Sequence, residues 1–74
     1  MLVTTYDLDG TPGPTLDLRR VDPVTLVIGQ EPVLAVAHWG MYMALTLPGR
    51  LVLVRVADYE RLVGYRCAPY QLPR

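Results

Sequence analysis

An uncharged, apolar stretch restricts the fold of this chain more than any other feature. Residues 32–49 carry no formal charge, and they continue through Pro48–Gly49 into the Val- and Leu-rich run Arg50–Val56. Between Met41 and Leu47, large apolar side chains occupy every second position, which is the spacing of a strand with one buried face. The stretch therefore predicts two strands joined by a tight Pro-Gly turn.

The remainder of the chain has the same character. Leu2–Tyr6 and Thr15–Arg20 predict a first hairpin around a loop of turn-forming residues at 7–14. A short strand is expected at Val24–Ile28, followed by a turn and the apolar segment Val33–Trp39. We therefore expect an all-β fold, a small antiparallel meander of five or six short strands that forms a barrel or a sandwich.

The main alternative is an α+β fold with one helix near residues 32–46. Pro32 suits the first position of a helix, and Ala, Leu and Met are good helix formers. Gly40 interrupts this segment, as a bulge or a bend in a strand would. That interruption and the alternation after it favour strands.

The C-terminal part is ambiguous. Ala57–Val63 predicts one or two helical turns with Asp58 as the N-cap, whereas Leu62–Cys67 could instead form a last strand. A chain of this length is expected to form one small domain, 1–74. Two prolines make residues 68–74 a candidate extended tail.

Charge is segregated along the chain, although the net charge is zero. Residues 1–31 hold five acids and two arginines, a net of −3, whereas residues 50–74 hold five arginines and two acids, a net of +3. Opposite charge in the two halves favours pairing within the chain or docking between copies over a general anion-binding surface.

The apolar content is high for the length. Apolar residues make up 51% of the chain, and a domain of about 60 residues buries only about 60% of its unfolded surface. Because the excess is contiguous, part of it is expected to face a partner. We predict an apolar contact surface with an arginine rim, formed by Trp39, Met41, Met43, Leu51 and Leu53 with Arg55, Arg61 and Arg66.

These features predict a non-catalytic protein–protein interaction module, without a cofactor or a metal. It is expected to form a homo-oligomer or to dock on a larger protein, as small viral or mobile-element accessory and inhibitor proteins do. A single cysteine, Cys67, cannot form an internal disulfide, and no cationic leader opens the chain, so a cytoplasmic location is expected.

Two other partners are considered. Arginines and tyrosines interleave after Val54, which makes a small β-barrel that binds single-stranded nucleic acid the main functional alternative. The uncharged residues 32–49 barely reach the length of a membrane helix, and they include His38 and Gly40, so no membrane partner is expected. The role of His38, beside Trp39, stays open.

The segment Leu2–Thr11 contains a short motif, Asp-Leu-Asp-Gly-Thr, after an apolar strand. It resembles the first motif of the haloacid-dehalogenase-like phosphatases. The resemblance implies a parallel α/β sheet, Asp7 as nucleophile, Asp9 as general acid/base, and Mg²⁺ as cofactor. The chain has no Lys for the later motifs, and Pro12 and Pro14 depart from the pattern. A phosphatase-like fragment is therefore the weakest alternative, and a hairpin turn is the expected role of these acids.

Overall fold

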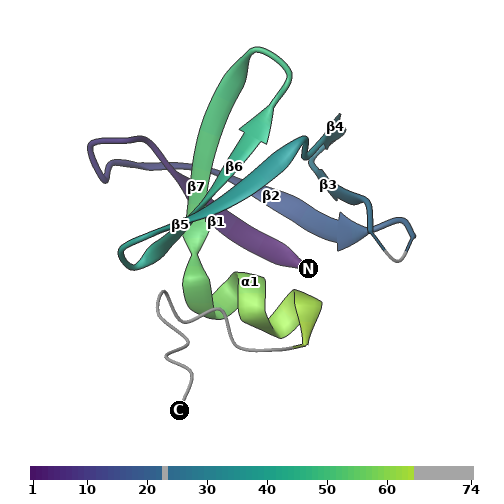
Figure 1. Ribbon diagram of the computed structural model, residues 1–74. Coiled ribbons are helices and arrows are strands. Elements are labelled where there is room, and N and C mark those ends of the chain that lie inside the picture. The colour runs from purple at the N-terminus through teal and green to yellow at the C-terminus, as the bar shows by residue number, and fades with distance from the viewer. Residues whose placement is uncertain (23, 65–74) are drawn as a thin grey trace.

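The computed structural model describes residues 1–22 and 24–64 and contains an antiparallel sheet and one helix (Figure 1). The all-β prediction is confirmed, with seven strands where five or six were expected, because a two-residue strand forms after Gln30. The strands are β1 Leu2–Tyr6, β2 Pro12–Arg20, β3 Leu26–Ile28, β4 Glu31–Pro32, β5 Ala35–Trp39, β6 Tyr42–Leu47 and β7 Arg50–Arg55, and the helix is α1 Val56–Val63.

The sheet is curled into a half-barrel. Its strand order is β4-β3-β2-β1-β7-β6-β5, so β4 and β5 are the two edges, although only Val33 and Leu34 separate them in the chain. The Val33 N–H donates to the Leu26 carbonyl on β3 at 2.9 Å, and the Leu34 N–H donates to the Thr46 carbonyl on β6 at 2.7 Å. The two edges are therefore held near each other at this end of the sheet.

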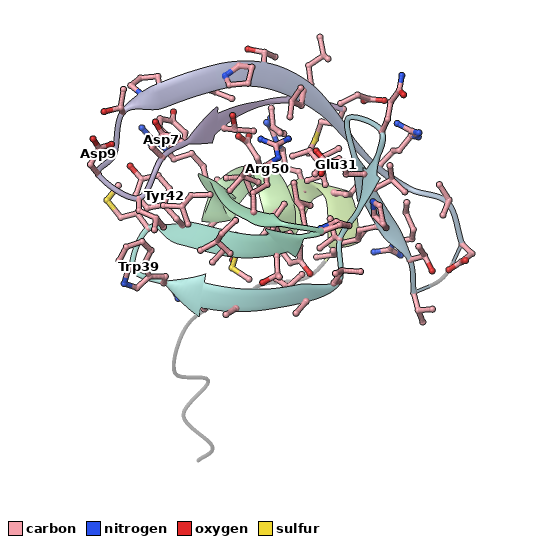
Figure 2. The ribbon with its side chains drawn as sticks, turned by 90° about the horizontal axis from the view of Figure 1, so that it is seen from above. Asp7, Asp9, Glu31, Trp39, Tyr42 and Arg50 are labelled. Carbon is pink, nitrogen blue, oxygen red and sulfur yellow. The ribbon has the colours of Figure 1, made fainter. Side chains whose placement is uncertain are left out.

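An ion pair closes the same region. Glu31 Oε2 on β4 accepts hydrogen bonds from Arg50 Nη2 at 2.6 Å and from Arg50 Nε at 3.2 Å, and Figure 2 shows the two side chains together. The pair joins the acidic part of the chain to the basic part, which is one of the two outcomes that the charge distribution favoured. Both side chains are partly exposed, so the pair contributes at most about 1 kcal/mol, and its effect is mainly on geometry.

The core lies inside the curl and is covered at one end by α1. On β6 and β7, cross-strand partners such as Met43 and Val54, or Leu45 and Val52, point inward together. Tyr59 on α1 packs into this core, and Gly64 ends the helix in the left-handed conformation, where its N–H donates to the Glu60 carbonyl. The other buried apolar residues of the core are Val3, Leu18, Leu26, Ile28 and Leu47.

Two predictions about helices are corrected. The alternative helix over residues 32–46 is wrong, because the chain reverses at Gly40–Met41 and forms β5 and β6. A helix at Ala57–Val63 is confirmed and starts one residue earlier, but Asp58 is not its N-cap. Arg55 holds that position in an extended conformation, and Asp58 lies in the first turn, where it pairs with Arg61. The alternative strand over Leu62–Cys67 is wrong for its first three residues, since Leu62 and Val63 belong to α1 and Gly64 is its C-cap. Residues 65–67 lie outside the described part, as does the predicted tail.

The first hairpin was predicted correctly, but its loop is shorter than expected. β2 begins at Pro12, and the register between β1 and β2 shifts between Thr4 and Tyr6. At this irregularity the buried Thr5 hydroxyl donates to the Pro14 carbonyl at 2.7 Å. A Cβ at Gly13 would lie 3.0 Å from Thr5 Oγ1, so a larger residue at this position would force the Thr5 hydroxyl to shift. In the described residues, no helix has the length and apolarity needed to cross a membrane.

Candidate functional site

The β5 edge of the sheet is exposed and uncharged. Four of its five side chains are exposed, and only His38 is half-buried. Within the described residues, β5 pairs with β6 alone, so the other side of its backbone has no strand partner. An edge of this kind presents unpaired N–H and C=O groups to another chain.

The opposite edge, β4, differs in length, charge and proline content. β4 is two residues long and consists of Glu31, which is ion-paired, and Pro32, which has no N–H to donate. Short length, charge and proline are the usual means by which edge strands avoid pairing with other molecules. The fold therefore protects one edge of its sheet and leaves the other available.

A tight turn places two large apolar side chains at the end of β5. Trp39 and Tyr42 are paired across the hairpin, so the turn contains only Gly40 and Met41. Gly40 has a φ of +61°, as the first central position of a type II′ turn requires. The Val56 N–H donates to the Met41 carbonyl at 3.0 Å, which ties the turn to the start of α1. Trp39 is 52% exposed and Met41 is 65% exposed.

A pocket of about 310 Å³ lies between this turn and the β1–β2 loop. Figure 2 shows Asp9 and Trp39 at the same end of the half-barrel, with Tyr42 between them. Asp9 is the only charged residue of the lining, and the remainder is mainly apolar or aromatic. The lining residues are Leu8, Asp9, Gly10, Trp39, Gly40, Met41, Tyr42 and Leu53.

Leu53 belongs to the pocket and not to the inner core. It lies on the face of β7 opposite to Val52 and Val54, in register with Tyr6 on β1 and Ala44 on β6. Although this is the outer face of the sheet, Leu53 is only 1% exposed. The outer face of the sheet therefore has a small cluster around Leu53, which is separate from the inner core and forms part of the pocket wall.

An aromatic and cationic cluster flanks the pocket. The ring centroids of Tyr6 and Tyr42 are 5.3 Å apart, and the planes are tilted by 55°. The Arg55 guanidinium carbon lies 5.3 Å from the Tyr6 centroid and 5.9 Å from the Tyr42 centroid, within the range of cation–π attraction. Arg55 is thus held against two rings, which brings together residues from β1, β6 and β7.

The two loop aspartates stabilise the turn between β1 and β2, Asp7 through its backbone and Asp9 through its side chain. The Asp7 N–H donates to the Thr11 carbonyl, and the Gly10 N–H donates to the Asp7 carbonyl, both at 2.9 Å. Asp9 Oδ1 accepts the Thr11 N–H at 2.9 Å, and this hydrogen bond holds the pKa of Asp9 below its usual value. The motif thus connects antiparallel strands, whereas the phosphatase resemblance implied a parallel sheet. In the described residues, no group of three or more His, Cys, Asp or Glu side chains is placed to hold a metal.

The predicted apolar contact residues differ in exposure, and the predicted arginine rim does not form one surface. Trp39 and Met41 line the pocket, and Leu51 is 40% exposed on β7. Met43 and Leu53 are 5% and 1% exposed, so the structure places them inside the chain and not on an exposed surface as the prediction had them. The predicted rim is divided: Arg55 lies in the tyrosine cluster, Arg61 pairs with Asp58, and Arg66 lies outside the described residues.

Sequence reasoning missed the contribution of the β1–β2 loop. Leu8, which is 59% exposed, lies within a run of turn-forming residues, and its apolar character was the one available signal. Tyr6 was assigned only to a strand, and its contact with Tyr42 depends on β7 lying between β1 and β6.

Searches with this chain against protein-family models, curated proteins and solved structures found no match. The geometry of the site is therefore the basis for its function. An uncharged strand edge binds another extended backbone by main-chain hydrogen bonds, and an adjacent apolar pocket accepts a large side chain. Both features suit a polypeptide partner.

Proposed function

We propose that this protein is a non-catalytic interaction module that associates with a second copy of itself through the free edge of β5. The observation that carries the proposal is the contrast between the edges: β4 carries a charge and a proline, whereas β5 carries neither and is exposed. A cytoplasmic location fits the single cysteine of the chain.

The composition of β5 suits pairing about a two-fold axis. In such a contact β5 pairs with its own copy in the antiparallel direction. A first residue that lies opposite a second residue of the other copy therefore has that pairing repeated with the two copies exchanged. A pairing centred on Ala37 would place Ala35 opposite Trp39 of the second copy, a small side chain facing a large one. No like charges would meet, because residues 32–49 carry none.

The test is to add a charge at the centre of this edge. Ala37 is exposed, and it faces away from the inner core because it is paired with Ala44, so A37K leaves the core intact. The matched control is A57K, which adds the same charge at an exposed alanine of α1. Light scattering coupled to size exclusion, over a series of protein concentrations, measures the mass of each protein.

We expect the wild-type protein and A57K to form dimers that dissociate on dilution, and A37K to remain a monomer. Surface substitutions of this kind change stability by about 0.5 kcal/mol or less. At protein concentrations where the dimers have dissociated, all three proteins should therefore unfold at similar urea concentrations, because dimerisation no longer stabilises the folded state. A wild-type protein that is monomeric at every concentration would refute self-association and leave this edge for a different, larger protein. A dimeric A37K would show that the copies meet elsewhere.

A second candidate, single-stranded nucleic acid, is favoured by one observation, the cluster of Tyr6, Tyr42 and Arg55. Tyrosine rings stack on bases, and arginine contacts phosphates. We rank it second because the rings already contact each other and Arg55. Retention on a single-stranded oligonucleotide that weakens with salt and is lost in R55Q, but not in R61Q, would support it.

A further inference from the structure

We infer that the pocket beside Trp39 is the docking site for the C-terminal segment of the same chain, residues 65–74. This inference does not rest on self-association through β5, because the proposed occupant belongs to the same chain. Trp39, the last residue of β5, lines the pocket, so the test below separates the two contacts. Residues 65–74 lie outside the described part of the structure, and they follow Gly64, the C-cap of α1.

The pocket has the chemistry of a site for an apolar side chain next to a cation. Leu8, Trp39 and Met41 are all more than half exposed, and they surround the buried Leu53. When a second apolar group covers exposed apolar side chains around a pocket, apolar surface is removed from water, which lowers the free energy of the system. The only charge in the lining is the carboxylate of Asp9, whose pKa is lowered by the Thr11 N–H, so it is ionised at neutral pH.

The C-terminal segment has the complementary composition. Its sequence, Tyr-Arg-Cys-Ala-Pro-Tyr-Gln-Leu-Pro-Arg, contains two arginines and no acid. Tyr70 and Leu72 are large apolar groups close to Arg74, which supplies a cation for Asp9. Pro69 and Pro73 restrict the backbone, which lowers the conformational entropy lost when the segment is ordered.

The segment is long enough to reach the pocket. α1 begins beside the pocket, since the Val56 N–H donates to the Met41 carbonyl, and its eight residues span about 12 Å at about 1.5 Å per residue. An extended chain covers up to about 3.3 Å per residue, so Tyr70, six residues after Gly64, reaches about 20 Å from the helix end. A short tether gives an effective concentration in the millimolar range, so contacts of modest strength suffice for occupancy.

Trp39 makes the inference testable, because it is the only tryptophan and it lines the pocket. Acrylamide quenching of its fluorescence measures its exposure directly. The proteins to compare are the wild-type chain of residues 1–74, the double variant Y70A/L72A and the control Q71A. Docking predicts faster quenching and red-shifted emission in Y70A/L72A only, with circular dichroism unchanged in all three.

Addition of a synthetic peptide of residues 65–74 to Y70A/L72A should restore the protection of Trp39. D9N in this background keeps the Oδ1 acceptor of the turn but removes the charge. It should weaken peptide binding by about two- to fivefold, the range of an exposed ion pair. The matched control is D22N, another loop aspartate that accepts backbone N–H groups.

Dilution distinguishes this docking from self-association. Docking within one chain predicts that Trp39 protection is independent of protein concentration and persists in A37K. Equal quenching of the wild-type chain and Y70A/L72A would overturn the inference, as would a peptide that does not bind. Protection that disappears on dilution would also overturn it and would assign the covering of Trp39 to a second copy.

Discussion

Replacement of Leu53 by alanine tests whether the outer face of the sheet has an apolar cluster that stabilises the fold. Leu53 and Leu51 lie on the same face of β7, two residues apart, so the two substitutions form a matched pair. They differ in burial, since Leu53 is 1% exposed and Leu51 is 40% exposed. The same chemical change is therefore made once at a buried position and once at a partly exposed position.

The expected magnitudes are well separated. Truncation of a fully buried leucine to alanine destabilises a protein by about 2–5 kcal/mol, because apolar burial is lost and a cavity remains. At Leu51 much of the side chain is already in water, so the loss should be about 1 kcal/mol or less. A domain of this length is stable by roughly 4–11 kcal/mol, so L53A should remove a large fraction of the total.

Urea unfolding, followed by circular dichroism, gives the free energy of unfolding of each variant. Trp39 fluorescence provides a second, local measurement, because Trp39 and Leu53 line the same pocket. We expect L53A, but not L51A, to alter the emission of the folded protein. A loss of less than about 1 kcal/mol in L53A, equal to that in L51A, would show that the outer face is not packed as described.

Two further predictions concern backbone strain and pH. In G40A the new Cβ would have open space around it, so the cost arises from the positive φ alone, and we expect a loss of about 1–2 kcal/mol in urea unfolding that D-alanine at the same position avoids. The pKa of Asp17 is lowered mainly by its hydrogen bond from the Met1 amino group, and Arg19 adds to this effect. A lowered pKa in the folded state stabilises the protein above the unfolded pKa, near 4, and this contribution is lost as the pH falls through the folded value. The difference in stability between wild type and D17N should therefore shrink below about pH 4, and a constant difference would contradict the assignment.

The strands that dominate the fold were predictable because their periodicity is local. The alternation at Met43, Leu45 and Leu47 fixes the inner face of β6, and the Pro48–Gly49 turn sets the register with β7. Periodicity alone misplaced Met41, which has the same parity as Met43 but lies in a two-residue turn and is exposed. The period of a strand applies only within the strand, and the turn at Gly40 determines where β6 begins.

The pocket was not predictable from local patterns, since it requires segments that are distant in the sequence. Leu53 appears as one more apolar residue in a continuous run, and nothing in that run shows which neighbours cover its outer side. The structure provides them through the pairing of β1 with β7, which places Tyr6 beside Leu53. The loop that contributes Leu8 follows directly after Tyr6. The contact between the first and last strands is a property of the curled sheet, and no periodicity within one segment encodes it.

The uncharged stretch of residues 32–49 forms two strands that differ in burial, and the proposed interaction role rests on this difference. Within β6, alternate residues enter the inner core, which accounts for part of the apolar excess. β5 contributes none of the buried core residues, although its composition is just as apolar. If the excess existed only to form a core, β5 would be buried or would carry polar side chains outward, as β4 does with Glu31. The chain changes from a charged, proline-containing edge to an uncharged one within four residues, so the unprotected character of β5 is specific to that strand and is the property that the A37K experiment tests.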